Sequence, residues 1–118
     1  MKKIASNRIG IDDGRFTLFS DFDTDGPMWS GVGPREVTQD IAFSDSFLSP
    51  PSVHLTIALW DVHEGHNMRM DFFAEDITAN GFRAVFKTWR NTKIARLQIA
   101  WQAIGEVADP DELWILSD

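Results

Sequence analysis

The sequence has no cysteine, no tyrosine and no long hydrophobic run. Without cysteine there is no disulfide framework, no thiolate metal site and no cysteine nucleophile, which fits a reducing compartment. No segment approaches the roughly 20 apolar residues of a membrane helix, and residues 1–8 are basic without the apolar stretch of a signal peptide. We therefore expect a soluble protein without membrane insertion, either cytoplasmic or released by a route that uses no signal peptide.

Basic residues are also scarce: 11 Lys and Arg stand against 18 Asp and Glu, a net charge of −7. Nucleic-acid phosphates require a positive surface, so we expect no nucleic-acid partner. The length of 118 residues fits one domain, which we place over 1–118 with a core at about 8–105 and a tail at 106–118. The chain has nine Phe and five Trp, and five Trp are more than one core of this size usually needs.

Alternation of apolar and polar residues predicts six strands and no long amphipathic helix. In the strand at 53–62, alternation places Leu59 and Asp61 on the inward face, and at 67–76 it does the same for Met68. Hairpin-like spacing from 53 to 104 predicts neighbouring strands in a meander. The pattern is typical of an antiparallel β-sandwich or barrel, with strands expected at 15–20, 36–43, 53–62, 67–76, 81–92 and 94–104.

The stretch 81–92 carries the main candidate site. Alternation puts Trp89 on its polar face, near the strand end and between Lys87 and Arg90. Pairing across the turn at 80–81 sets Arg69 roughly opposite Trp89 or one step beyond it. A guanidinium stacked on the indole is one interpretation, and spacing alone favours it. The other is a sugar platform, in which the indole holds the apolar face of a pyranose while Arg69, Arg90 and a nearby carboxylate bind its hydroxyls.

Metal binding and catalysis find little support. His63 and His66 are three residues apart and near Asp61, but the segment is more typical of an exposed polar turn. Asp71 and Glu75 share a strand face, which a solvated outer surface explains without a glycosidase pair. No Ser/His/Asp grouping and no phosphate-binding loop is present. We expect no enzyme activity, no cofactor and no metal.

Two segments fall outside the strand pattern. Residues 21–34, rich in Asp and Gly and holding Trp29, form the longest irregular segment, and such loops are often functional. Residues 109–112 are typical of a helix start. The apolar residues 113–116 that follow are expected to cover an end of the core or to dock on another subunit.

Several motifs in order resemble the H-type lectin family, whose members include the snail agglutinins and the discoidins. The similarity covers about 36–105 and extends loosely back to residue 8. The motifs are Pro50-Pro51-Ser52-Val53, Trp60-Asp61-Val62, Asn67-Met68-Arg69, Gly81-Phe82, the run from Thr88 to Lys93, and Ala100-Trp101.

The resemblance implies a six-stranded antiparallel β-sandwich that assembles as a homotrimer, or as a larger hexamer. It also implies sugar sites at the junctions between subunits. Arg69 matches the family's sugar-binding Arg and Trp89 its stacking aromatic residue. Arg90 stands where the snail agglutinin has His. Val32 stands where that protein offers an Asp, so we look to Asp23 or Asp25 for the carboxylate.

Two functions follow from this resemblance. The first is a non-catalytic, multivalent lectin that recognises the terminal sugar of glycans, a hexose or N-acetylhexosamine of the galactose or GalNAc type. The alternative is a trimeric structural or adhesion module that has lost sugar binding. The changes at Val32 and Arg90 favour the alternative, whereas the retained Arg69 and Trp89 favour the lectin.

Overall fold

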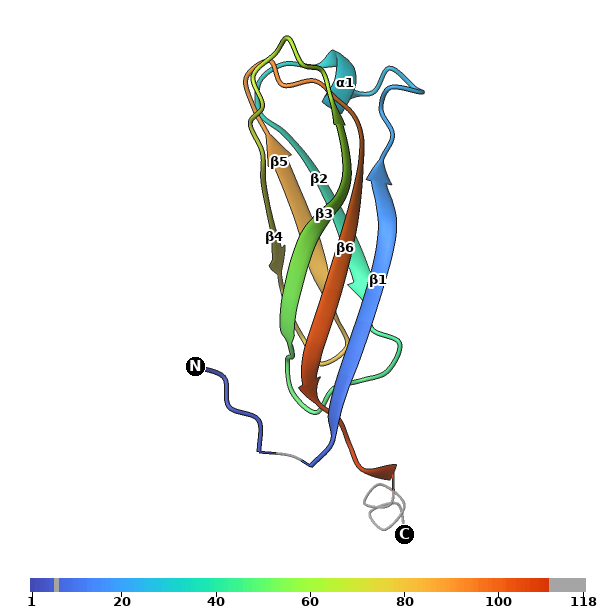
Figure 1. Ribbon diagram of the computed structural model, residues 1–118, viewed down its shortest axis with the longest axis vertical. Coiled ribbons are helices and arrows are strands. Elements are labelled where there is room, and N and C mark those ends of the chain that lie inside the picture. The colour runs from blue at the N-terminus through green and yellow to red at the C-terminus, as the bar shows by residue number, and fades with distance from the viewer. Residues whose placement is uncertain (6, 111–118) are drawn as a thin grey trace.

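A computed structural model describes residues 1–5 and 7–110, in which six strands form two three-stranded antiparallel sheets (Figure 1). The first sheet has the order β1-β6-β3 and the second the order β2-β5-β4. The expected all-β fold with six antiparallel strands is confirmed. The elements are β1 (Ile9–Phe19), α1 (Pro27–Ser30), β2 (Arg35–Ala42), β3 (Ser52–Val62), β4 (Asp71–Glu75), β5 (Gly81–Thr88) and β6 (Ile94–Glu106).

Apolar side chains from both sheets meet in two packed clusters. One contains Phe82 and Ala84 of β5 against Ile99 and Trp101 of β6. The second includes Phe19, Met28, Phe86, Ile94 and Leu97, and it supports the short helix α1. The predicted inward faces of β5 and β6 are therefore correct. Burial of these faces is the main favourable term that holds the sandwich together.

Strand β1 starts six residues earlier than the sequence predicts. Gly10, Asp12 and Gly14 have low strand propensity, yet they pair with β6 from Ile9 to Thr17. Gly14 is required there because a Cβ at this position would lie 2.6 Å from the Nε1 atom of Trp101. Packing against β6 thus overrides local propensity in the first half of the strand.

A bulge in β3 reverses the expected facing of its last residues. The register shifts between Ile57 and Leu59, so that Leu59 lies opposite Gln98 and Asp61 opposite Arg96. The prediction that Leu59 and Asp61 face the core was wrong. The bulge inserts one extra residue into β3, so every side chain after it points to the opposite face of the sheet from the one that alternation predicts. Strand β4 is also shorter than predicted, and Met68, which precedes it, is 52% exposed.

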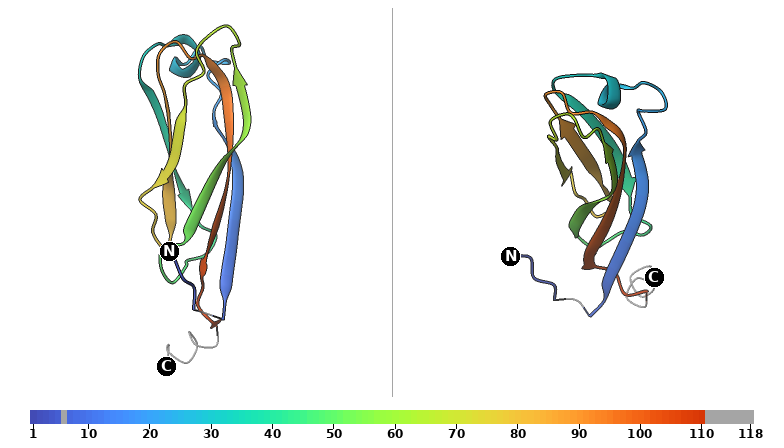
Figure 2. Two further views of the ribbon diagram at one scale, coloured as in Figure 1. Left: turned by 60° about the vertical axis from the view of Figure 1, so that its left-hand side comes forward. Right: turned by 45° about the horizontal axis from the view of Figure 1, so that its top comes forward.

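The chain crosses between the sheets instead of forming a continuous meander. Of the strands from 53 to 104, β4 and β5 are hairpin neighbours, but β3 pairs with β6 on the other sheet. Three of the four segments that cross between the sheets, 20–34, 63–70 and 89–93, lie at one end of the sandwich, and the fourth, 43–51, lies at the other end (Figure 2). No helix among the described residues is long and apolar enough to cross a membrane. The helix start expected at 109–112 extends beyond the described residues, and the apolar run 113–116 lies outside them.

Candidate functional site

The site residues predicted from the sequence lie at the end of the sandwich that carries α1 (Figure 1). We call this the α1 end and define it by segments 20–34, 63–70 and 89–93. Strands β1, β3 and β5 end here and β2, β4 and β6 begin here. The loops therefore stand on the ends of a rigid scaffold, an arrangement that commonly positions binding residues.

Trp89 comes directly after β5, and its side chain is open to solvent. The strand ends at Thr88, and the backbone turns at Arg90, which has a φ of 60°. Trp89 is 37% exposed and borders a shallow cavity of about 320 Å³. The indole is thus available to a ligand. The other lining residues are Pro34, Arg35, Glu36, Lys87 and Thr88.

Arg69 lies two residues before β4. The β4–β5 ladder begins at the pair of Asp71 and Lys87, and the same register continued for two residues sets Arg69 opposite Trp89. Two buried hydroxyls fix its backbone. Thr88 Oγ1 donates to the Arg69 carbonyl, and the Arg69 N–H donates to Thr92 Oγ1 at 3.0 Å.

Replacing Thr92 by Val should loosen this connection. The Thr92 side chain is fully buried; its hydroxyl accepts from Arg69 N–H and donates to the Trp89 carbonyl at 3.0 Å. Valine has nearly the same shape but leaves both backbone groups without a partner, which costs roughly 1–3 kcal/mol. We expect this loss in urea unfolding, with Thr92→Ser as the matched control that keeps the hydroxyl. An unchanged unfolding midpoint for Thr92→Val would contradict the role given to this hydroxyl.

Arg35 connects the two segments on which the site is built, a role that the sequence pattern did not indicate. Its guanidinium donates to five backbone carbonyls at 2.8–3.3 Å, and so joins the loop before β2 to the turn after β5. Burial lowers the pKa of Arg35 from its ordinary value. The planar guanidinium has five N–H donors in fixed directions and can therefore bind several carbonyls at once, which the ammonium group of a lysine cannot do in the same way. The carbonyls belong to Pro27, Met28, Gly33, Arg90 and Thr92.

Charged side chains near Trp89 remain available to a ligand. Arg69 and Arg90 are exposed, and neither forms an ion pair with any described residue. Glu36 lines the same cavity as Trp89, beside its strand neighbour Lys87. This carboxylate was missed from the sequence, where it is one of several polar residues on the outer face of β2. It is the acid that lines the cavity beside the indole.

Asp23 and Asp25, the acids expected from the loop, do not line the Trp89 cavity within one protomer. Asp23 accepts a hydrogen bond from the Ser20 hydroxyl at 2.6 Å and lines a separate cavity. Asp25 is exposed with a φ of 54°, and its carbonyl accepts from the Ser30 hydroxyl. Val32, at the position where an acid was expected, is 77% exposed.

His63 and His66 form a hydrogen-bonded pair, with their Nδ1 atoms 2.7 Å apart. His63 Nδ1 also accepts from the Gly65 N–H at 3.1 Å. Among residues 1–5 and 7–110 no group of three or more acidic or histidine side chains is placed to hold a metal ion. The pair belongs to the turn after β3, next to Trp29, whose ring centroid is 6.1 Å from that of His63.

The histidine pair predicts a pH effect on stability. The pKa of His66 is lowered from 6.5 by burial and then by the nearby charges of His63 and Lys93. The unfolded chain therefore binds more protons below about pH 6.5, so stability falls from that pH down to the folded pKa and recovers as pH rises. In urea unfolding at a series of pH values, we expect His66→Asn to remove part of the acid sensitivity. Parallel pH curves for the two proteins would contradict this.

Glu75, part of the acidic pair considered for catalysis, forms an ion pair away from Trp89. It lies 3.8 Å from Arg83, which also pairs with Asp40 and Asp76.

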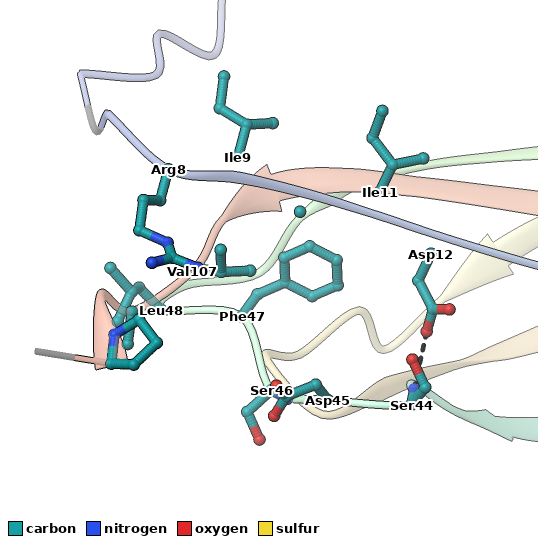
Figure 3. A pocket seen from close by; sticks show the side chains of 13 residues that line it. Arg8, Ile9, Ile11, Asp12, Ser44, Asp45, Ser46, Phe47, Leu48 and Val107 are labelled. Atoms are coloured by element: carbon teal, nitrogen blue, oxygen red, sulfur yellow. Dashed lines mark hydrogen bonds between the residues drawn. The ribbon is translucent and has the colours of Figure 1, made fainter. Parts of the chain in front are cut away.

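A cavity of about 610 Å³ lies at the opposite end of the sandwich, between the start of β1 and residues 44–48. Figure 3 shows its apolar side chains and the hydrogen bond from Ser44 N–H to Asp12. This cavity is not near Trp89.

Comparison with known proteins agrees with the fold and with the motifs. The model of the H-type lectin domain matches residues 38–104. A Fuscovulum blasticum protein, ATP synthase subunits region ORF 7, is 47% identical over 106 residues, 90% of this chain and 91% of that protein. Discoidin-2 of Dictyostelium discoideum is 32% identical over 81 residues, 68% of this chain and 32% of that protein.

The structure of recombinant discoidin II from the same organism superposes with a TM-score of 0.72 at 25% identity. The superposition covers 89% of this chain and 39% of the discoidin II chain. This chain thus spans 32–39% of the discoidin relatives and 91% of the Fuscovulum blasticum protein. The resemblance found in the sequence is confirmed over most of the chain.

Proposed function

Since the chain belongs to the H-type lectin family, we propose that it is a carbohydrate-binding lectin without catalytic activity. Its ligand is the terminal sugar of a glycan, a hexose or N-acetylhexosamine of the galactose or GalNAc type. Trp89 stacks on the apolar face of the sugar ring, and the guanidinium groups of Arg69 and Arg90 donate to its hydroxyls. Family and fold both favour a non-enzymatic role.

The observation that carries this proposal is an exposed indole across from an unpaired arginine. Trp89 is 37% exposed, and Arg69 lies opposite it in the continued register without an ion pair among the described residues. Had the two served only packing, burial of the indole would be expected. The alternative of a guanidinium stacked on the indole also lacks support, since the cation–π contacts of the described chain are those of Lys87 and Lys93.

We further propose that the site is completed by a second copy of the chain, in a trimer or a hexamer of two trimers. Within one protomer the cavity at Trp89 is shallow, and Asp23 and Asp25 do not line it. A neighbouring copy offers a route by which one of these acids reaches the sugar. Several weak sites on one particle then raise the apparent affinity by about 10²–10⁴ when they engage a surface that displays many sugars.

A glycan array combined with a native mass measurement tests the proposal. We expect binding to glycans that end in galactose or N-acetylgalactosamine, and a particle of three or six chains. An array without signal at high protein concentration, from a correctly assembled particle, would support the alternative of a structural or adhesion module. Val32 and Arg90, which depart from the snail agglutinin, are the observations that favour this second function.

Restoring the acid at position 32 should strengthen sugar binding. Val32 is 77% exposed beside Gly33, whose N–H donates to the Arg90 carbonyl at 2.8 Å, so the position is at the site and tolerates a polar side chain. A carboxylate there adds a charge-assisted acceptor for a sugar hydroxyl, which corresponds to an affinity gain of about tenfold. Calorimetry with N-acetylgalactosamine measures the effect, and Val32→Asn controls for polarity without charge. Equal or weaker binding by Val32→Asp would contradict the assignment of position 32 to the sugar-binding Asp of the snail agglutinin.

A further inference from the structure

A second cavity of about 410 Å³ lies at the α1 end, on the side of the β1-β6-β3 sheet. Its size is within the range of small-molecule sites, about 300–1,000 Å³. Its walls combine aromatic rings with acidic and basic groups. The residues that define it are Phe22, Asp23, Trp29, Asp61, His63 and Arg96. We propose that it is a second saccharide site on each protomer, which holds one neutral pyranose unit.

The aromatic wall of this cavity is exposed and yet fixed in place. Phe22 is 60% exposed, and its ring meets that of Trp29 edge to face, with centroids 5.2 Å apart at 79°. The ammonium of Lys93 lies 4.5 Å from the centre of the Trp29 ring and holds it from another side. An exposed aromatic surface of this kind suits the C–H groups of a sugar ring.

Hydrogen bonds of the backbone fix the conformation of the loop that carries these rings. The Phe22 N–H donates to the Ala95 carbonyl at 3.0 Å, which anchors the loop to β6. The Asp21 carbonyl accepts from Gly26 N–H at 2.8 Å, and the Asp21 carboxylate accepts from Met28 N–H at 2.9 Å. A loop closed on itself in this way loses little further freedom on binding, which favours affinity.

The charges around the cavity favour a neutral polyhydroxyl ligand. Asp61 Oδ2 lies 3.4 Å from Arg96 Nε, and both side chains remain more than half exposed. Asp23 adds one further carboxylate and His63 an imidazole. Opposite charges that nearly balance give no strong preference for an anion or a cation, whereas they offer both donors and acceptors to hydroxyl groups. The chemical class is therefore an uncharged sugar.

The turn 89–93 lies between this cavity and the Trp89 site. Its first residue, Trp89, borders one, and its last residue, Lys93, contacts Trp29 of the other. The Lys93 carbonyl also accepts from the His63 N–H at 2.9 Å. One glycan chain with more than one sugar unit can thus approach both sites from the same end. The second site does not depend on the proposed function of Trp89.

Indole N–H signals in ¹H–¹⁵N spectra separate the two sites. The protein is titrated with D-galactose, N-acetyl-D-galactosamine, D-glucose and N-acetyl-D-glucosamine, one at a time. We expect at least one of these sugars to shift the Trp29 signal. Phe22→Ser and Asp61→Asn should each weaken this response by about tenfold and leave the Trp89 response unchanged. Leu48→Ser, which changes a similarly exposed apolar residue at the opposite end, should leave both responses unchanged.

The outcomes for the two sites are distinguishable. If none of the four sugars shifts the Trp29 signal, the second site is overturned, whatever happens at Trp89. A Trp29 shift that disappears in Trp89→Ala also overturns it, because the change then spreads from the first site. A Trp29 shift that survives in Trp89→Ala and weakens in Phe22→Ser and Asp61→Asn supports it. An unresponsive Trp89 signal counts against the proposed function alone.

Discussion

Trp89→Ala is expected to lower the affinity for a galactose-type monosaccharide by at least about 30-fold, the loss expected when a central aromatic contact is removed, roughly 2 kcal/mol. The indole is the large apolar surface of the proposed site, and in that proposal the neighbouring arginines reach the hydroxyls of a sugar that the ring holds in place. On a surface coated with glycan, where several sites act together, the reduction should be larger still. Calorimetry and surface binding measure the two effects.

The fold should survive this change. Trp89 follows β5 and is more than one third exposed, so its truncation should alter the free energy of unfolding by no more than about 1 kcal/mol. Trp60→Ala is the matched control, since Trp60 is 50% exposed on the edge strand β3, away from the Trp89 cavity. An affinity and a number of bound sugars that are both unchanged in Trp89→Ala, or an equal loss in Trp60→Ala, would show that the sugar does not depend on this ring.

Arg35→Ala is expected to be the most destabilising change at the α1 end. The guanidinium serves five carbonyls from two segments, and its loss leaves several partly buried acceptors without a donor. We expect a loss of roughly 2–3 kcal/mol in urea unfolding. Sugar binding should weaken as well, because the turn that carries Trp89 and Arg90 is held through the Arg90 and Thr92 carbonyls.

Two variants test the reason for this effect. Arg35→Lys keeps the charge, but a single ammonium cannot reach five carbonyls in a fixed plane, so most of the stability loss should remain. Arg15→Ala removes an exposed arginine that bonds only the side chain of Gln98 in the described structure, and should cost less than about 1 kcal/mol. Full recovery by Arg35→Lys would mean that charge, and not geometry, is what the site needs.

Periodicity in the sequence was sufficient to predict β5, β6 and their inward faces. The apolar positions 82, 84 and 86 of β5 and 97, 99 and 101 of β6 are buried, as alternation predicts, and Val85 on the other face of β5 is buried as well. The pairing of β4 with β5 likewise followed from the turn before Gly81. These features depend on neighbours within a few residues, which a sequence displays directly.

The errors have a common cause in long-range pairing. The first half of β1 is held by β6, about 90 residues away, and local propensity does not report this. The bulge after Ile57 reversed the facing of Asp61, because it inserts a residue that alternation cannot reveal. The expected meander failed for the same reason, since β3 finds its partner in β6 on the first sheet.

The site was predicted in part. An aromatic residue among cations is visible in the sequence, and the structure leaves Trp89 exposed near Glu36 and Lys87. The roles of Arg35, Thr88 and Thr92 were missed, because their hydrogen bonds to backbone carbonyls and amides arise only when two distant loops meet. The acids of the 21–34 loop were assigned to the Trp89 site, where one protomer does not place them. Their part in the Trp89 site stays a prediction that requires a neighbouring copy.

A crystal structure of the protein soaked with N-acetylgalactosamine would test the central claim most directly. We predict electron density for a sugar ring stacked on the Trp89 indole, with Arg69 within hydrogen-bond distance of its hydroxyls and a second copy of the chain closing the site. Density for the sugar only elsewhere, or an indole of Trp89 covered by protein in the assembly, would contradict the account.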